Sequence, residues 1–285
     1  MLENLPRPIG YVLGGGGSLG AMQVGMLQAL AEHDARPDLV VGTSVGSLNG
    51  AVLALDPAGA ATRLSHLWTR VRKEQIFPGG WFSQVRNLQR SKTYLYGNTA
   101  LAGLIEDFLG PIRSFDDLAL PFGAVSTDVS TALPVTIREG DLEPALLASA
   151  AIPGIFPLVE HGGRRLYDGG VVANVPMTQA VQMGAKSLVV LDCTFPGQLS
   201  ESLDTMTDIL LVTAIVRMRS QAAMEAPIIA SEVPVVYLPG PAAQLISPLD
   251  FEHTAELMEQ SYASARRFLQ QVEVDGPGLY GSPGS

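Results

Sequence analysis

A serine set between two glycines is the feature of the sequence most suggestive of chemistry. In "LVVGTSVGSLNGAVLAL", residues 39–55, an apolar run of strand type stops at Gly42, and Ser44 and Gly46 lead into a helix-like segment. Glycines make tight turns and serine caps helices, so the pattern has an ordinary structural explanation. It also matches G-x-S-x-G, the nucleophile elbow, in which a strand-to-helix turn exposes a serine Oγ at the edge of a sheet. The second interpretation predicts nucleophilic catalysis by Ser44.

A glycine-rich loop follows the first apolar run of the chain, residues 9–13. The loop, "GGGSLG" at residues 15–20, formally fits a dinucleotide-binding fingerprint. That fingerprint needs a carboxylate at the tip of the second strand, but Asp38 lies at the beginning of that strand. A dinucleotide site is therefore disfavoured. A Walker A loop is excluded because no Lys-Ser or Lys-Thr pair follows the glycines.

The same loop could instead stabilise a negatively charged intermediate beside Ser44. Two parallel strands joined by a helical crossover usually lie close together, so both loops should emerge at the same carboxyl edge of the sheet. Glycines before a helix leave backbone N–H groups free and unshielded by side chains. An oxyanion hole needs such donors, each typically worth about 3 kcal/mol of barrier.

A serine nucleophile also needs a base, and the sequence offers two candidates for it. His161, in "VEHGGRRLYDGG", is the best candidate among the histidines for a Ser-His-Asp triad. The same stretch holds Asp168 at the end of "RRLYD", before two glycines. A carboxylate there can serve as a base, although Asp-Gly turns are common. The other histidines, which have ordinary surface or capping explanations, are His33, His66 and His253.

Four motifs, "GGGGSLG", "GTSVGS", "ASAAIPGIFP" and "YDGGVVANVP", occur in this order between about Tyr11 and about Val190. Together they resemble the patatin-like phospholipase family. The resemblance implies an α/β fold of three layers, α/β/α, with a mostly parallel central sheet. It also implies a Ser–Asp dyad without histidine, with Ser44 as the nucleophile and Asp168 as the proton acceptor. Neither a metal nor an organic cofactor is expected.

The resemblance assigns further roles around this dyad. Backbone N–H groups of Gly16, Gly17 and Ser18 would form the oxyanion hole, and Pro153 would shape the wall of the site. Leu19 stands where many members of the family have Arg or Lys, so the loop must rely on backbone donors and the helix dipole. This difference puts in doubt a preference for anionic phospholipid head groups. The motif glycines are Gly15, Gly20, Gly42, Gly46, Gly169 and Gly170.

These observations predict a lipid acyl hydrolase of phospholipase A or esterase type, which works through an acyl-enzyme. Two alternatives stay open. One is a non-catalytic lipid-binding or regulatory protein that keeps the fold, and the other is a Ser-His-Asp esterase that uses His161. The presence of both Ser44 and Asp168 favours the dyad enzyme over the non-catalytic protein.

Composition limits the partners and the compartment of the protein. The chain has 285 residues, of which 47% are hydrophobic and 16% charged, so a sizeable core is available. A net charge of −10 without a basic tail disfavours nucleic acid as a partner. One cysteine, Cys193, allows no internal disulfide, and no Cys/His cluster has the spacing of a metal site. Because no signal peptide or membrane-spanning stretch is evident, a cytoplasmic protein is expected.

Strands alternate with helices along the chain, which predicts a parallel sheet with helices on both faces. We expect a catalytic core over 9–192, C-terminal helices and a strand on the same domain over 193–272, and a disordered tail over 273–285, which is rich in Gly, Pro and Ser. Strands are expected at 9–13, 37–42, 121–129, 133–137, 164–168, 186–193 and 233–238. Helices are expected at 18–34, 47–55, 141–153, 175–185, 203–225 and 250–271.

Residues 63–92 form a basic and aromatic segment within an acidic chain. The segment contains seven cationic residues and a single acidic one, Glu74, and both tryptophans of the protein lie in it. This composition suits a cap that contacts a membrane, and equally a cap with a solvated basic face and buried aromatics. The residues concerned are Arg63, Arg70, Arg72, Lys73, Arg86, Arg90 and Lys92, with Trp68, Phe77, Trp81 and Phe82.

Overall fold

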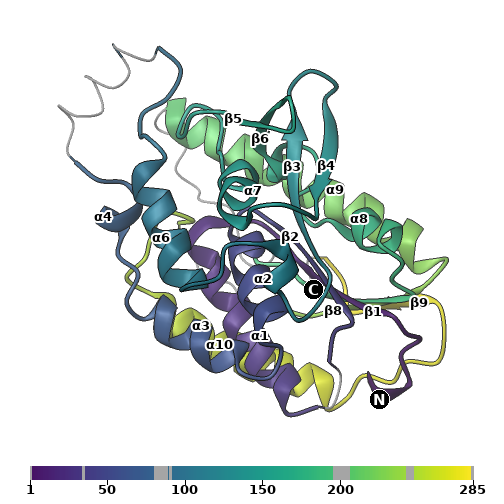
Figure 1. Cartoon of the computed structure of the whole chain (residues 1–285). Coiled ribbons are helices and arrows are strands. Elements are labelled where there is room, and N and C mark those ends of the chain that lie inside the picture. Colours follow the sequence, from purple (N-terminus) through teal and green to yellow (C-terminus); the bar gives the residue numbers. More distant parts are fainter. Residues whose placement is uncertain are drawn as a thin grey trace.

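A mixed, mostly parallel sheet lies between two layers of helices in a computed structural model of the protein (Figure 1). The structure describes residues 2–33, 36–79, 89, 92–194, 206–241 and 247–283. Within them the strand order is β5-β6-β3-β2-β1-β7-β8-β9, and β4 pairs with β3 beside this path. The strands are β1 (Ile9–Leu13), β2 (Leu39–Thr43), β3 (Phe122–Asp128), β4 (Leu133–Ile137), β5 (Val159–His161), β6 (Arg164–Asp168), β7 (Ser187–Leu191), β8 (Pro234–Tyr237) and β9 (Gly278–Tyr280).

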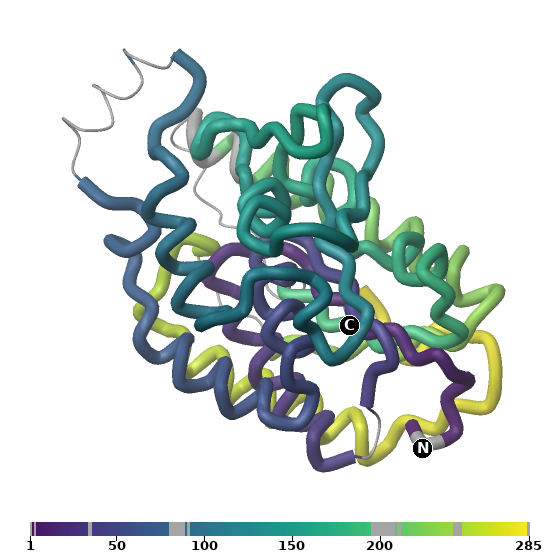
Figure 2. Tube along the Cα trace, viewed as in Figure 1, coloured from purple at the N-terminus to yellow at the C-terminus, as the bar shows by residue number. Residues whose placement is uncertain are grey.

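Helices from both ends of the chain cover one face of this sheet. The N-terminal helix α1 and the C-terminal helix α10 pack side by side there (Figures 1 and 2). The other face is covered by α8 and α9. The helices are α1 (Ala21–Ala31), α2 (Val45–Leu55), α3 (Ala60–Trp68), α4 (Lys73–Ile76), α6 (Thr99–Leu109), α7 (Leu142–Ser149), α8 (Met177–Gln182), α9 (Met206–Ala230) and α10 (Thr254–Leu269), with 3-10 turns η1 (Leu2–Asn4), η2 (Gly17–Gly20), η3 (Phe115–Asp117) and η4 (Gly169–Val171).

The central strands are apolar on both sides because helices cover both faces. Every residue of β1 and of β2 is buried. Along β1, Tyr11 and Leu13 belong to the core on the α1 face, whereas Val12 belongs to the core on the α9 face. This alternation with period two is the geometry of a strand, and continuous apolar runs are typical of parallel sheets. The predicted three-layer α/β/α fold is therefore confirmed.

Strand β3 determines where the ends of two distant strands meet. On one edge of β3, the first half of the strand pairs with β2 and the end of the strand pairs with β6. On the opposite edge, β3 pairs with β4. Thus β2 and β6 occupy successive stretches of one edge. Thr43, which ends β2, pairs with Val125, and Asp168, which ends β6, pairs with the next residue, Ser126. Ser44 and Asp168 are therefore brought together although they are far apart in the sequence.

Most predicted elements are present, and the differences have physical reasons. The helix expected at 141–153 ends at Ser149, before Pro153. The sequence did not predict α3, α4, α6 or β5. The first three helices lie in or next to the basic segment, whose mixed composition hides the helical period.

The C-terminal tail departs from its prediction of disorder. Gly278–Tyr280 form β9, which pairs in parallel with β8 at the edge of the sheet. The Tyr280 hydroxyl donates a 2.6 Å hydrogen bond to the Asp275 carboxylate. A short edge strand held by main-chain hydrogen bonds needs no apolar pattern, so composition alone gave the wrong prediction for these residues.

Within the basic segment, the tryptophan that the structure describes is a core residue. Trp68 is 2% exposed and stacks on Phe251 at a centroid distance of 6.5 Å. Its indole Nε1–H donates a 2.9 Å hydrogen bond to Asn49 Oδ1. Trp68 is therefore not available for membrane contact. Other residues singled out in this segment, Trp81, Phe82, Arg86 and Arg90, lie outside the described residues.

Candidate active site

Ser44 occupies a strained turn between β2 and α2. Its φ of 54° and ψ of −127° are rare for a residue with a side chain, and such strain is concentrated at functional sites. The Ser44 N–H donates to Ser149 Oγ at 3.0 Å, and the Ser149 hydroxyl in turn donates to the Val125 carbonyl at 2.6 Å. Ser149 therefore ties the turn to β3. Ser44 itself is 8% exposed.

The two glycines that flank Ser44 are required by close approach of the backbone. A Cβ on Gly46 would lie 2.2 Å from the Leu13 carbonyl oxygen, and a Cβ on Gly42 would lie 2.2 Å from the Gly46 carbonyl oxygen. Both distances are far shorter than any real contact. The start of α2 thus packs directly on the end of β1, where the glycine loop begins. The spacing of G-x-S-x-G follows from this packing.

Asp168 is a buried carboxylate in contact with Ser44. Burial raises its pKa to about 6, and hydrogen bonds from the Ser44 side chain and the Gly170 N–H partly oppose this rise. The Gly170 N–H lies 2.7 Å from Asp168 Oδ1. The backbone of Asp168 is also fixed, because its N–H donates to the Ala151 carbonyl at 3.0 Å and Thr127 Oγ1 donates to its carbonyl at 2.9 Å. The two residues predicted for the dyad therefore lie together.

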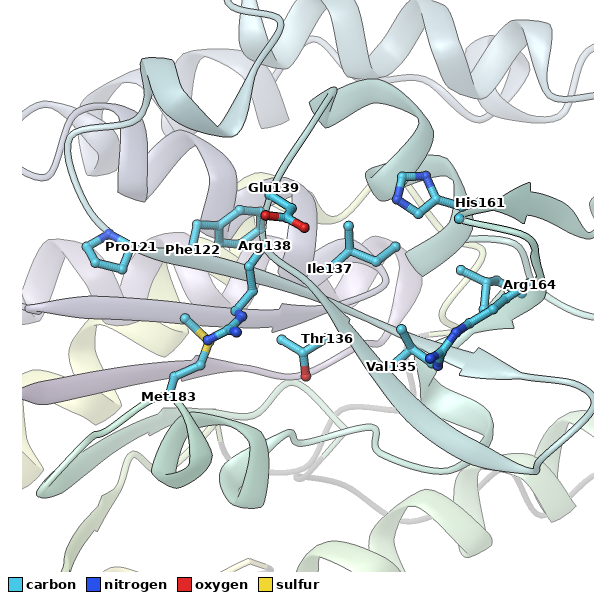
Figure 3. A pocket seen from close by; sticks show the side chains of 12 residues that line it. Pro121, Phe122, Val135, Thr136, Ile137, Arg138, Glu139, His161, Arg164 and Met183 are labelled. Atoms are coloured by element: carbon cyan, nitrogen blue, oxygen red, sulfur yellow. The ribbon is translucent and has the colours of Figure 1, made fainter.

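His161 lies elsewhere, at the end of β5. It lines a pocket of about 570 Å³ between the β5–β6 turn and the β3–β4 edge, with Arg138 and Arg164 (Figure 3). Neither Ser44 nor Asp168 lines this pocket. In the part of the chain that the structure describes, His161 makes no hydrogen bond to either of them. The geometry therefore favours Asp168 over His161 as the partner of Ser44.

The glycine loop runs beside the nucleophile, as its topology predicts. A Cβ on Gly15 would lie 3.0 Å from Ser44 Cβ. Gly17 has a φ of +61°, and a Cβ there would lie 2.3 Å from the Pro248 carbonyl oxygen. Among the described residues, no acceptor is bonded to the N–H groups of Gly16 and Gly17. These two donors open the η2 turn, where the helix dipole favours negative charge.

The third expected donor, Ser18, has a different role in the structure. Its N–H donates to the Pro248 carbonyl at 2.8 Å, and its hydroxyl donates to the Ser247 carbonyl at 3.1 Å. Its backbone donor is therefore occupied, and the oxyanion donors that remain are those of Gly16 and Gly17. The sequence has no signal that residues so near the C-terminus reach back to this loop.

Buried amide side chains hold the glycine loop from below. Gln23 Nε2 donates to the Gly14 carbonyl at 2.7 Å and to the Leu191 carbonyl at 3.0 Å. Asn174 Nδ2 donates to the Gly15 carbonyl at 3.3 Å, and the Asn174 backbone carbonyl accepts the Gly15 N–H at 3.2 Å. Sequence reasoning gave no role to these residues or to Ser149, although Ser149 and Asn174 lie inside quoted motifs. Their positions could have been noticed, but their partners could not.

Other residues that the sequence singled out lie at the margin of the site. Leu19 is partly buried against the core on the α1 face, so an apolar side chain suits its position. Pro153 is exposed in the turn after α7. Across the described ranges, no group of three or more His, Cys, Asp or Glu side chains is arranged to hold a metal ion. No helix there combines the length and apolar character needed to cross a bilayer.

Comparison with known proteins gives consistent matches for this site region. A family model described as patatin-like phospholipase matches residues 11–181. Patatin-like phospholipase domain-containing protein 7 of Mus musculus is 32% identical over 188 residues, which cover 65% of this chain and 13% of that protein. Lysophospholipase NTE1 of Kluyveromyces lactis is 26% identical over 287 residues, which cover 94% of this chain and 19% of that protein.

The chain therefore spans a small part of the length of these relatives. Among solved structures, VipD from Legionella pneumophila aligns with a TM-score of 0.48 at 15% sequence identity. That alignment covers 93% of this chain and 67% of VipD.

Proposed function

Because this chain belongs to the patatin-like phospholipase family, we propose that it is a lipid acyl hydrolase that cleaves carboxylic esters through Ser44 and Asp168. The observation that carries the proposal is the hydrogen bond between the Ser44 side chain and the buried Asp168 carboxylate. The strained turn at Ser44 and the two donors of the glycine loop support it. The test is covalent labelling of Ser44 by a fluorophosphonate, which reacts only with activated serines.

In the proposed reaction, Asp168 removes the Ser44 hydroxyl proton while Oγ attacks the ester carbonyl. The N–H groups of Gly16 and Gly17 bind the resulting oxyanion. When the tetrahedral intermediate collapses, the alcohol leaves with the proton held by Asp168, and an acyl-Ser44 remains. Asp168 then takes a proton from water, which attacks the acyl carbonyl. When this second tetrahedral intermediate collapses, Asp168 returns the proton to Ser44 Oγ and the fatty acid leaves.

We expect the rate to depend on pH through Asp168. Its raised pKa of about 6 makes it a stronger base than an ordinary carboxylate, and it must be ionised to accept a proton. With a soluble short-chain ester, kcat/KM should be low below pH 5, rise through about pH 6 and stay level above pH 7. A rising limb that disappears in a His161→Ala variant would contradict this assignment.

His161→Ala should leave kcat/KM within a few-fold of the parent, because this side chain contacts neither member of the dyad. The measurement is steady-state hydrolysis of the same short-chain ester. If instead the variant loses activity by about 10³-fold or more, as removal of a triad histidine does, the Ser-His-Asp alternative is correct.

The non-catalytic alternative has one specific observation in its favour, the 8% exposure of Ser44. A lipid-binding protein with a sealed serine would fold in the same way. It would not react with a fluorophosphonate, so the same labelling experiment distinguishes it from the hydrolase.

Cations of the basic segment are proposed to contact an anionic lipid surface. Arg70, Arg72 and Lys73 are exposed beside α4. Replacing all three with Gln should weaken binding to vesicles that contain anionic lipid by about 100-fold, because each cation near such a surface contributes about 1 kcal/mol. Binding to neutral vesicles should not change. Equal binding to both kinds of vesicle before and after the change would leave this segment a purely structural cap.

A further inference from the structure

Helix α9 is held over the loop that follows Asp168. On its inner side, Met218 Cε lies 3.1 Å from the position that a Cβ on Gly170 would take. The Glu225 carboxylate accepts hydrogen bonds from the Thr178 N–H at 2.9 Å and from the Thr178 hydroxyl at 2.6 Å. These contacts fix α9 to α8 and bring it against the turn that follows the proposed general base.

The outer face of α9 is exposed and carries large apolar side chains beside smaller polar ones, Thr213 and Ser220. Its large apolar side chains are 45% to 66% exposed and recur seven, eight and four residues apart, which places them on one stripe. At 1.5 Å per residue the stripe is about 28 Å long. These side chains are Ile209, Val216, Met224 and Ile228.

This face of α9 also carries few charged side chains. The exposed side chains that the structure describes on α9 include one cation, Arg217, and no acid, although the chain has a net charge of −10. A surface helix of a water-exposed protein normally turns its polar residues outward. Val171 in η4, which is 42% exposed and in the turn next to α9, adds a further apolar side chain beside Asp168.

We propose that the outer face of α9 contacts lipid. A helix whose described exposed side chains include several large apolar groups, one cation and no acid is suited to the interface between head groups and acyl chains. A protein partner of comparable stability would need a broad complementary surface of about 1,000 Å² or more, whereas this stripe is one helix wide. The choice of lipid as occupant rests on the proposed function, because a lipid ester enters from such a surface.

An environment-sensitive dye tests the contact directly. Met224→Cys can be labelled selectively, because the natural Cys193 is fully buried. The matched control is Leu133→Cys, since Leu133 is 61% exposed, similar to Met224 at 62%, but lies on β4. With phosphatidylcholine vesicles, the emission of the dye should shift to shorter wavelength at position 224 and stay constant at 133. Constant emission at 224, or equal shifts at both positions, overturns the proposal.

Substitution tests the energetic role of the same face. A triple variant, Val216→Gln, Met224→Gln and Ile228→Gln, should weaken partition into these vesicles by about tenfold, with Leu133→Gln as the control. Hydrolysis of a soluble short-chain ester should stay within about twofold, because none of these residues contacts the dyad.

The outcomes separate the two proposals. If the parent hydrolyses no soluble ester but its vesicle binding still depends on α9, the docking face stands and the proposed function fails. If the parent is an esterase and the triple variant binds vesicles normally, the docking face is wrong. A parent dimer in solution that the triple variant converts to a monomer would also overturn the proposal, in favour of a second copy as the occupant.

Discussion

Asp168→Asn should lower kcat/KM for ester hydrolysis by about 10³- to 10⁴-fold. Asparagine has nearly the same shape and can keep the position of the carboxylate, but its amide cannot accept the proton of Ser44. The measurement is steady-state hydrolysis of a short-chain ester by purified parent and variant. A loss of less than about tenfold would mean that Asp168 is not the general base.

The stability of Asp168→Asn shows whether its activity is lost because the general base is missing or because the protein is misfolded. Burial raises the Asp168 pKa from 3.8 to about 6, so ionising this carboxyl is harder in the folded protein than in the unfolded chain. The ionised group therefore lowers the free energy of unfolding above pH 6, and this destabilisation fades as pH falls towards 4. We expect Asp168→Asn to raise Tm relative to the parent at pH 8, with a smaller difference at pH 4. A fall in Tm at pH 8 would indicate that the activity was lost through misfolding.

Gly46→Ala is the second change with a large expected effect. The added methyl group would meet the carbonyl oxygens of Leu13 and Gly14 at 2.2 and 2.5 Å, and these are backbone atoms that no rotamer change can move. Helix α2 must shift away from the glycine loop, which separates Ser44 from its oxyanion donors. We expect a loss of about 1–3 kcal/mol in the free energy of unfolding and at least about 100-fold in kcat/KM.

The matched control for this change is Gly103→Ala in α6. Nothing lies within 4 Å of the position of its Cβ, and alanine is favoured over glycine in a helix. It should keep full activity and unfold at the same or a higher denaturant concentration. If Gly46→Ala behaves like this control, the close packing of α2 on the end of β1 does not position the site.

The chemical residues of the site could be predicted from the sequence because each one sits in a local pattern. Ser44 follows a strand and precedes a helix between two glycines, and Asp168 ends a strand before two more. Their contact depends on the pairing of β3 with both β2 and β6. That register joins segments with no local signal for each other, so it becomes visible only in the fold.

Residues that support the site from a distance could not be predicted in the same way. The carbonyl of Pro248 accepts the Ser18 N–H. The hydroxyl of Ser149 accepts the Ser44 N–H and donates to a carbonyl of β3. For Trp68, composition left membrane contact and burial equally open, and the structure buries its indole against Asn49. In α9 the apolar residues lie on both sides of the helix. The periodicity of the sequence therefore does not show which side of α9 is buried and which is exposed.

Reaction with a fluorophosphonate probe, which labels only activated serines, tests the proposed dyad most directly. The parent protein, Ser44→Ala and Asp168→Asn should be treated side by side, and the modified residue located by mass spectrometry. We expect labelling of the parent at Ser44 and none in either variant. An unlabelled parent that is well folded would contradict the dyad and favour a lipid-binding protein, and undiminished labelling of Asp168→Asn would show that another group activates Ser44.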